Sequence, residues 1–107
     1  MLILGVAYKK NVEDHRETPA FRLMELLFER KAKVDYYDPY VPHLTPTRDY
    51  DFQMSSIDIS AEKLTEYDIV ILTTDHDTFD YEMIVDKSQI LVDTRGRYQN
   101  NVNVIRA

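Results

Sequence analysis

Apolar residues along the chain fall into short runs separated by polar segments. The pattern predicts strands over residues 2–8, 34–38, 68–74 and 89–94. Most of these runs are almost continuously apolar, which is typical of strands buried on both faces of a parallel sheet. Residues 103–107 are compatible with a final edge strand. Residues 47–59 are ambiguous, because "FQMSSIDI" allows one more short strand.

Helical signals occur between these strands. Thr18 can cap a helix that has Pro19 at its first position. Apolar residues then follow at helical spacing, at Ala20, Leu23, Met24, Leu27 and Phe28. The last turn of this helix is expected to carry basic residues, which suit a helix C-terminus, namely Arg30, Lys31 and Lys33.

Shorter helices are predicted further along the chain. One covers residues 61–67, with Ser60 as its cap, and another covers residues 79–88. Residues 38–46 contain three prolines and must form a loop. This alternation of strands and helices predicts one α/β domain over residues 1–107, built on a mostly parallel sheet.

Composition narrows the function classes. The chain has 107 residues, of which 44% are hydrophobic and 30% charged, and its formal net charge is −6. General nucleic-acid binding is therefore not expected, since phosphate backbones attract a basic face. No apolar run approaches membrane-spanning length, and no signal-peptide pattern is present, so we expect a cytoplasmic protein without membrane contact.

Cysteine and glycine are scarce. The chain has no cysteine, which excludes a disulfide, a thiolate metal site and a nucleophilic thiol. It has only two glycines, and the first strand begins directly after Met1. Both features fit a piece of a larger chain. The Gly-rich dinucleotide turn, the P-loop and the G-x-S-x-G elbow are all absent from the sequence.

Ligands of open parallel sheets bind outside the carboxyl ends of the strands. If the predicted strands are parallel, their carboxyl ends share one edge of the sheet. That edge would gather aromatic and basic residues, namely Tyr8, Lys9, Lys10, Arg16, Arg95 and Arg97. A phosphate or pyrophosphate is the obvious ligand for such a cluster, because it accepts several charge-assisted hydrogen bonds.

Plainer interpretations exist for the basic residues near the first strand. Lys9 and Lys10 also fit an ordinary solvated loop. Arg16 lies just before a helix N-terminus, where a cation is unfavourable. It therefore needs either an outside anion or an acidic neighbour in the chain; the candidates are Glu13, Asp14 and Glu17.

Arg95 follows a buried strand and precedes Gly96, which allows the backbone to turn or to approach a ligand. The alternative is a turn arginine that pairs with Asp93. Residues 74–80, "TDHDTFD", contain ligand types for a metal around His76. The favoured interpretation is instead that the acids lie at a helix start, with His76 on a loop.

Four motifs occur in order along the chain: "LGVAYKKNVEDHRETPAFRLMELL", "YYDPYVP", "TTDHDTFDY" and "LVDTRGRY". Together they resemble the C-terminal, UDP-binding domain of the UDP-glucose/GDP-mannose dehydrogenase family, over essentially the whole chain. The forms "GVAYKKNVEDHRE" and "DTRGRY" are most similar to the bacterial branch that oxidises UDP-N-acetylglucosamine or its mannosamine relative. The resemblance implies a Rossmann-like, three-layer α/β domain.

The resemblance also implies an activity and residue roles. Such enzymes oxidise the C6 alcohol of a UDP-sugar to a carboxylate for polysaccharide synthesis, with NAD held by an N-terminal domain. By the family pattern, Tyr8, Lys9 and Arg95 contact the UDP-sugar, and Arg16 reaches the NAD. The pattern gives His76 no metal role.

The catalytic cysteine of the family is missing, because the chain has none. The resemblance therefore implies that this chain alone catalyses nothing and works with the other domains of a homo-oligomeric enzyme. A second hypothesis is a stand-alone interaction or regulatory module that keeps the fold without the ligand, with the tyrosine-rich "DYYDPYVP" loop as its partner face.

Overall fold

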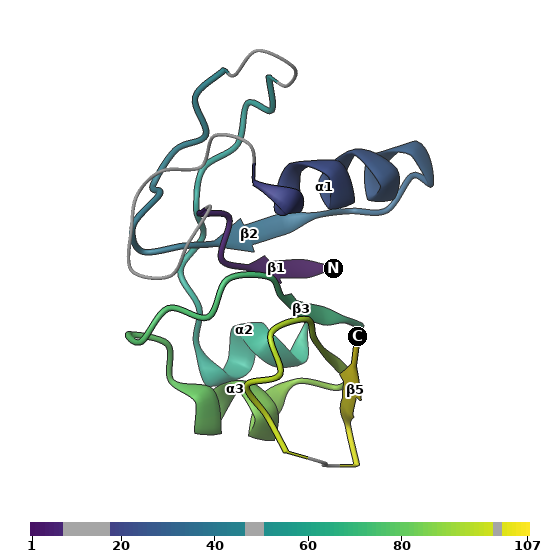
Figure 1. Cartoon of the computed structure of the whole chain (residues 1–107), viewed down its shortest axis with the longest axis vertical. Coiled ribbons are helices and arrows are strands. Elements are labelled where there is room, and N and C mark those ends of the chain that lie inside the picture. The colour runs from purple at the N-terminus through teal and green to yellow at the C-terminus, as the bar shows by residue number, and fades with distance from the viewer. Residues whose placement is uncertain (8–17, 47–50, 100–101) are drawn as a thin grey trace.

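The strands of the domain form one parallel sheet. The structure, a computed structural model, describes residues 1–7, 18–46, 51–99 and 102–107. Its strands are β1 (Leu2–Leu4), β2 (Asp35–Tyr37), β3 (Val70–Leu72), β4 (Leu91–Asp93) and β5 (Val104–Arg106). All are parallel, in the order β2-β1-β3-β4-β5 (Figure 1). Its helices are α1 (Pro19–Glu29), α2 (Ala61–Thr65) and α3 (Tyr81–Lys87).

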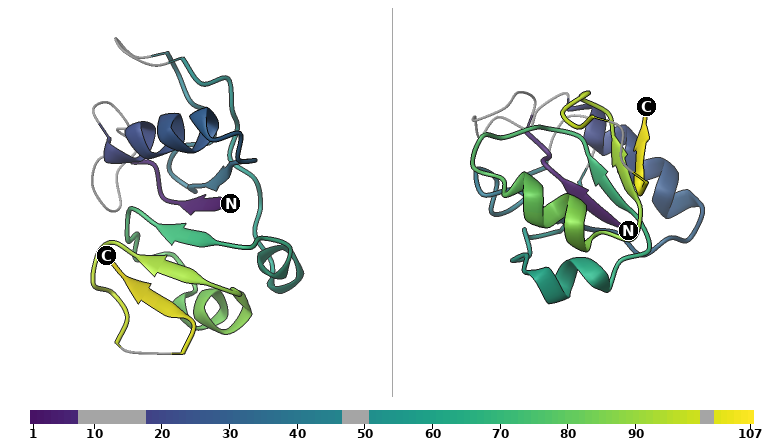
Figure 2. Two further views of the ribbon diagram at one scale, coloured as in Figure 1. Left: turned by 90° about the vertical axis from the view of Figure 1, so that its right-hand side faces the viewer. Right: turned by 90° about the horizontal axis from the view of Figure 1, so that it is seen from below.

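Helices cover both faces of the sheet, which makes three layers (Figure 2). Successive residues of a strand point to opposite faces. Ile3 accordingly packs into the cluster that includes α1. Leu2 and Leu4 pack into the other cluster, with Leu64 of α2 and Ile84 of α3. The expected Rossmann-like α/β fold with its parallel sheet is confirmed, including the edge strand near the C-terminus.

The helix starts follow the expected capping chemistry. The Thr18 hydroxyl accepts a hydrogen bond from the Ala20 N–H, and Ser60 accepts one from the Lys63 N–H. Asp80 caps α3 by accepting from the Met83 N–H at 3.1 Å. Each side chain satisfies a backbone donor that has no partner within the helix.

One expectation about the elements is wrong, and one region that the sequence leaves ambiguous is described in part. Helix α1 ends at Glu29, so the basic residues expected in its last turn follow the helix instead. Lys31 has φ 62°, the left-handed conformation that commonly stops a helix. In the described part of 47–59, residues 51–59, there is no additional strand, only an isolated bridge between His43 and Ser55.

Candidate functional site

The carboxyl ends of the parallel strands meet at one edge of the sheet, as the sequence predicts. Two of the basic residues expected there, Arg95 and Arg97, lie in the described turn after β4. The other three basic residues, Lys9, Lys10 and Arg16, and the aromatic Tyr8 lie outside the described residues. The described part of the edge is therefore built from the ends of β1 to β4 and the turns that follow them.

Arg95 is tied to the end of the neighbouring strand. Its Nε–H donates to the Thr73 carbonyl at 2.8 Å, while its backbone N–H donates to Asp93 Oδ1 at 2.9 Å. The contact with Asp93 is thus made by the backbone and not, as the alternative interpretation had it, by the guanidinium. The bond to the Thr73 carbonyl uses only Nε, and it holds the exposed guanidinium at the carboxyl edge.

Asp93 shapes the turn that carries Arg95. It is fully buried, and its other oxygen accepts from the Tyr98 N–H at 2.8 Å. Gly96, in the same turn, has φ 69°, a conformation that glycine adopts without strain. Because the buried carboxylate accepts hydrogen bonds from two backbone N–H groups, it holds the turn that carries Arg95 in one conformation.

Arg97 packs on an aromatic ring. Its guanidinium lies 4.2 Å from the centroid of the Tyr81 ring, and its Nη1 is 4.0 Å from Asp75 Oδ2. Burial raises the pKa of Tyr81 to about 12, although the charge of Arg97 opposes the rise. The neutral Tyr81 hydroxyl donates to the His76 carbonyl at 2.6 Å. A cation over a ring is attracted by the ring's quadrupole, so Arg97 also has a defined place.

The backbone that leaves β1 is fastened to the end of β3. The Thr73 hydroxyl donates to the carbonyls of Leu4 and Gly5, and the Thr74 hydroxyl donates to the Ala7 carbonyl at 2.7 Å. Gly5 has φ 87°, and a Cβ there would lie 2.5 Å from the Thr74 Cβ. Glycine is therefore required because Thr74, which follows β3, occupies the space.

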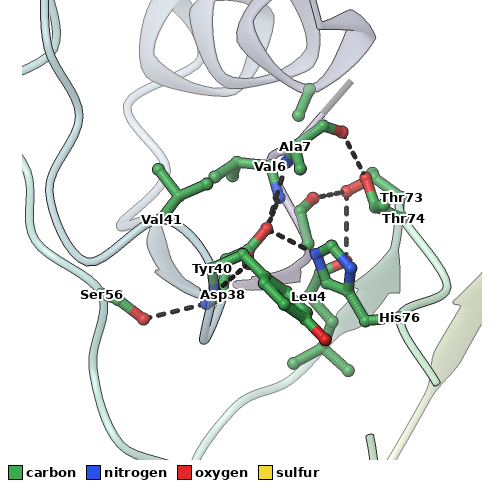
Figure 3. A network of polar contacts seen from close by, with 12 residues as sticks. Leu4, Val6, Ala7, Asp38, Tyr40, Val41, Ser56, Thr73, Thr74 and His76 are labelled. Atoms are coloured by element: carbon green, nitrogen blue, oxygen red, sulfur yellow. Dashed lines mark hydrogen bonds and ion pairs between the residues drawn. The ribbon is translucent and has the colours of Figure 1, made fainter. Parts of the chain in front are cut away.

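A buried acid–histidine pair lies at the carboxyl edge, where it joins the ends of β2 and β3 (Figure 3). Asp38 Oδ2 accepts from the N–H groups of Val6 at 2.8 Å and Ala7 at 3.1 Å. The same oxygen is 2.9 Å from Nε2 of His76, and Oδ1 accepts from the Tyr40 N–H at 2.8 Å. Both Asp38 and His76 are fully buried.

The surroundings keep Asp38 ionised. Burial by itself raises the pKa of a carboxyl group. The hydrogen bond from His76 and those from Val6 and Tyr40 outweigh the burial, so that the pKa of Asp38 lies below its ordinary value of 3.8. An ionised carboxylate can only accept hydrogen bonds, so Nε2 of His76 carries the hydrogen in this pair.

The sequence prediction for His76 was right about the loop and missed the burial. Asp38 was not singled out, although it ends the predicted strand 34–38, and His76 follows the strand 68–74. The carboxyl ends of parallel strands share one edge of the sheet, which places these two residues at the same edge as the basic residues. The signal in the sequence that indicates this pair is a carboxylate and an imidazole that follow two buried strands.

Two other kinds of feature are absent from the described ranges, a metal-ion site and a membrane-spanning helix. No group of three or more histidine or acidic side chains there is arranged to hold a metal ion. None of the helices in those ranges is long and apolar enough to cross a membrane.

Comparison with known proteins gives consistent matches. A family model, "UDP-glucose/GDP-mannose dehydrogenase family, UDP binding domain", matches residues 2–100. UDP-N-acetyl-D-mannosamine dehydrogenase of Methanococcus maripaludis is 35% identical over 77 residues, 72% of this chain and 16% of the relative. UDP-N-acetyl-D-glucosamine 6-dehydrogenase of Salmonella typhi is 33% identical over 79 residues, 74% of this chain and 18% of the relative.

A solved structure agrees over nearly the whole chain. The UDP-D-ManNAc dehydrogenase of Pyrococcus horikoshii superposes with a TM-score of 0.70 at 25% identity. The match covers 98% of this chain and 24% of that one. The chain thus spans about a quarter or less of the length of these relatives.

Proposed function

The chain belongs to the UDP-glucose/GDP-mannose dehydrogenase family, in which it corresponds to the UDP binding domain, and on this basis we propose that it binds the nucleotide part of a UDP-sugar. The whole enzyme would oxidise the C6 alcohol of the sugar to a carboxylate with NAD, in the synthesis of polysaccharide precursors. The named relatives favour an N-acetylglucosamine or N-acetylmannosamine substrate.

The observation that carries this proposal is the placement of Arg95. Its Nε–H is fixed on the Thr73 carbonyl at the carboxyl edge, where ligands of parallel sheets bind. An arginine held by one nitrogen presents the rest of its planar fork to a phosphate with little loss of side-chain entropy. Tyr8 and Lys9 belong to the same proposed UDP-sugar site by their place in the family pattern.

We assign NAD chiefly to another domain. The first strand of a dinucleotide-binding domain leads into glycines that make room for a pyrophosphate. Here the space beside Gly5 is filled, since a Cβ there would lie 2.5 Å from both the Cβ and the carbonyl oxygen of Thr74. The described residues at this turn do not fit a dinucleotide, and Arg16 would reach a cofactor bound elsewhere.

The remaining machinery also belongs to other parts of the proposed enzyme. The chain has no cysteine and so lacks the nucleophile that the family pattern implies. Its partners would be the other domains of a homo-oligomeric enzyme. The proposed location of that enzyme is the cytoplasm, and a cysteine-free domain needs no oxidising compartment. The alternative of an independent interaction module has less support, since the relatives named above are dehydrogenases.

Titration of UDP into the ¹⁵N-labelled chain, followed by amide chemical shifts, tests the proposal. We expect saturable shifts around Arg95. The substitution Arg95→Ala should raise the Kd for UDP by roughly 10- to 100-fold, because a hydrogen bond to a charged group contributes about 1.5–3 kcal/mol.

Arg30→Ala is the matched control. Arg30 is also exposed, but it follows the C-terminal end of α1, away from the carboxyl edge. The control should bind UDP with unchanged affinity. Shifts scattered away from Arg95, or equal losses in the two variants, would count against the proposed site.

A further inference from the structure

Asp38 and His76 join three strand ends at one point. Asp38 follows β2, His76 belongs to the loop after β3, and the N–H groups of Val6 and Ala7 belong to the segment that leaves β1. A single oxygen, Asp38 Oδ2, receives all three of these partners, at 2.8, 3.1 and 2.9 Å (Figure 3). The carboxylate thus ties together segments that are far apart in the sequence.

The contacts extend the order of β1 beyond the sheet. The last main-chain bond of β1 to β2 in this region runs from the Gly5 N–H to the Tyr37 carbonyl. Past that point the backbone donors of Val6 and Ala7 turn to Asp38, and the Ala7 carbonyl accepts from Thr74. Side chains therefore hold this segment in place of a neighbouring strand.

His76 is fixed for its part in the pair. Its ring lies 4.6 Å from the Tyr40 ring and 5.3 Å from the Phe79 ring, measured between centroids. Its carbonyl accepts from the Tyr81 hydroxyl. An imidazole held by packing on two sides can donate to Asp38 in only one orientation, which makes the carboxylate a fixed acceptor for the β1 segment.

We propose that Asp38 and His76 are positioning residues for the UDP site. They hold Val6 and Ala7, and the next two residues of the chain are Tyr8 and Lys9, which the proposed function assigns to the UDP-sugar. The same end of β3 carries Thr73, whose carbonyl holds Arg95. The pair therefore fixes the described backbone that leads into the proposed site, an inference that rests on the proposed function.

The test compares two substitutions of His76. His76→Phe keeps a ring against Tyr40 and Phe79 but removes the donor to Asp38. His76→Gln is the conservative control, because its amide N–H can replace Nε2–H. If Val6 and Ala7 then adopt the conformation that binds UDP in about a tenth of the molecules, the Kd of His76→Phe for UDP rises about tenfold. His76→Gln should bind within about twofold of the unmodified chain if its amide keeps that population high.

Amide hydrogen exchange supplies a second readout. In His76→Phe, exchange should accelerate at Val6 and Ala7 more than at Val70, whose N–H donates to the Ile90 carbonyl inside the sheet. Asp38→Asn should act in the same direction, because its amide nitrogen cannot accept hydrogen bonds. A merely structural role would lower the unfolding midpoint of these variants without changing the UDP affinity of the folded protein.

The outcomes separate this inference from the proposed function. If the unmodified chain binds UDP and Arg95→Ala weakens the binding, but His76→Phe binds normally, the positioning role is overturned and the function stands. Unchanged exchange at Val6 and Ala7 in His76→Phe also overturns the role. If the unmodified chain shows no saturable UDP binding, the proposed function fails and the link between the pair and UDP fails with it.

Discussion

At the scale of single residues, Gly5 is a tightly constrained backbone position in the described part of the edge. An alanine there would have to keep φ near 87° with its Cβ 2.5 Å from the Thr74 carbonyl oxygen. The clash is with backbone, so no side-chain rotation relieves it. We expect Gly5→Ala to lower the free energy of unfolding by roughly 2–4 kcal/mol, from strain and overpacking together, as measured by urea denaturation.

Gly96 supplies the matched control. It also has a left-handed φ, 69°, but among the described residues a Cβ there would meet only Arg106 Nη2, at 3.5 Å. Gly96→Ala should therefore cost only the conformational strain, about 1 kcal/mol. Equal losses for the two variants would mean that the contact with Thr74 is not what requires glycine at position 5.

At the scale of elements, the short helix α2 depends on its cap. Five residues cannot hold a helix by main-chain bonds alone, because the first and last turns leave donors and acceptors unpaired. Ser60 Oγ accepts from the Lys63 N–H at 3.1 Å. We expect Ser60→Ala to cost about 1 kcal/mol of stability in urea denaturation.

The control at this position is Ser60→Asp, whose carboxylate can accept the same bond and lies at the positive end of the helix. It should unfold at nearly the urea midpoint of the unmodified chain. A similar loss in both variants would show that packing of Leu64, which is fully buried in the core, holds α2 without the cap.

Elements could be predicted from the sequence better than their ends and contacts. Strand 68–74 was found because its apolar residues are consecutive, yet hydrogen bonding limits β3 to Val70–Leu72. The sequence predicts a C-terminal end of α1 that is too late, because basic residues suit a helix end whether they lie inside it or after it. Local patterns of this kind do not contain the position where the hydrogen bonds stop.

The contacts of the site were harder to predict for a different reason. Asp38 and His76 are 38 residues apart, and only the strand order β2-β1-β3 brings them to one point. The sequence placed both residues at strand ends, but their pairing depends on β1 lying between the two strands. Arg95 could be placed at the edge, whereas its bond to the Thr73 carbonyl follows from the register of β3 and β4.

At the scale of the whole molecule, the sheet has a polar carboxyl edge built around buried carboxylates. Asp38 and Asp93 are both fully buried, and each closes on backbone N–H groups from turns at that edge. The acidic residues behind the formal net charge of −6 therefore differ in their effect on stability. Buried, hydrogen-bonded carboxylates stabilise the fold, whereas exposed carboxylates mainly repel one another. Acid should therefore act on the fold through the buried carboxylates.

The pKa of Asp38 gives the direction in which stability should change with pH. Its pKa in the folded chain is lowered, since the hydrogen bonds from His76 and the backbone outweigh the burial that would raise it. The unfolded chain therefore binds a proton at this group at a higher pH than the folded chain does. The stability that Asp38 contributes is fully present above its ordinary pKa of 3.8 and is lost as the pH falls through the lowered value.

Urea denaturation of the unmodified chain and of Asp38→Asn between pH 7 and pH 3 measures this contribution. At pH 7 the substitution should destabilise the fold, because an amide nitrogen replaces an accepting oxygen among N–H donors. The difference between the two proteins should shrink as the pH falls below about 4, since protonation removes the charge of Asp38 in the unmodified chain as well. Asp86→Asn, at an acid whose side chain is 71% exposed, should differ little from the unmodified chain at any pH. If the stability difference between Asp38→Asn and the unmodified chain stays constant down to pH 3, the hydrogen bonds at this edge do not stabilise the ionised form of Asp38.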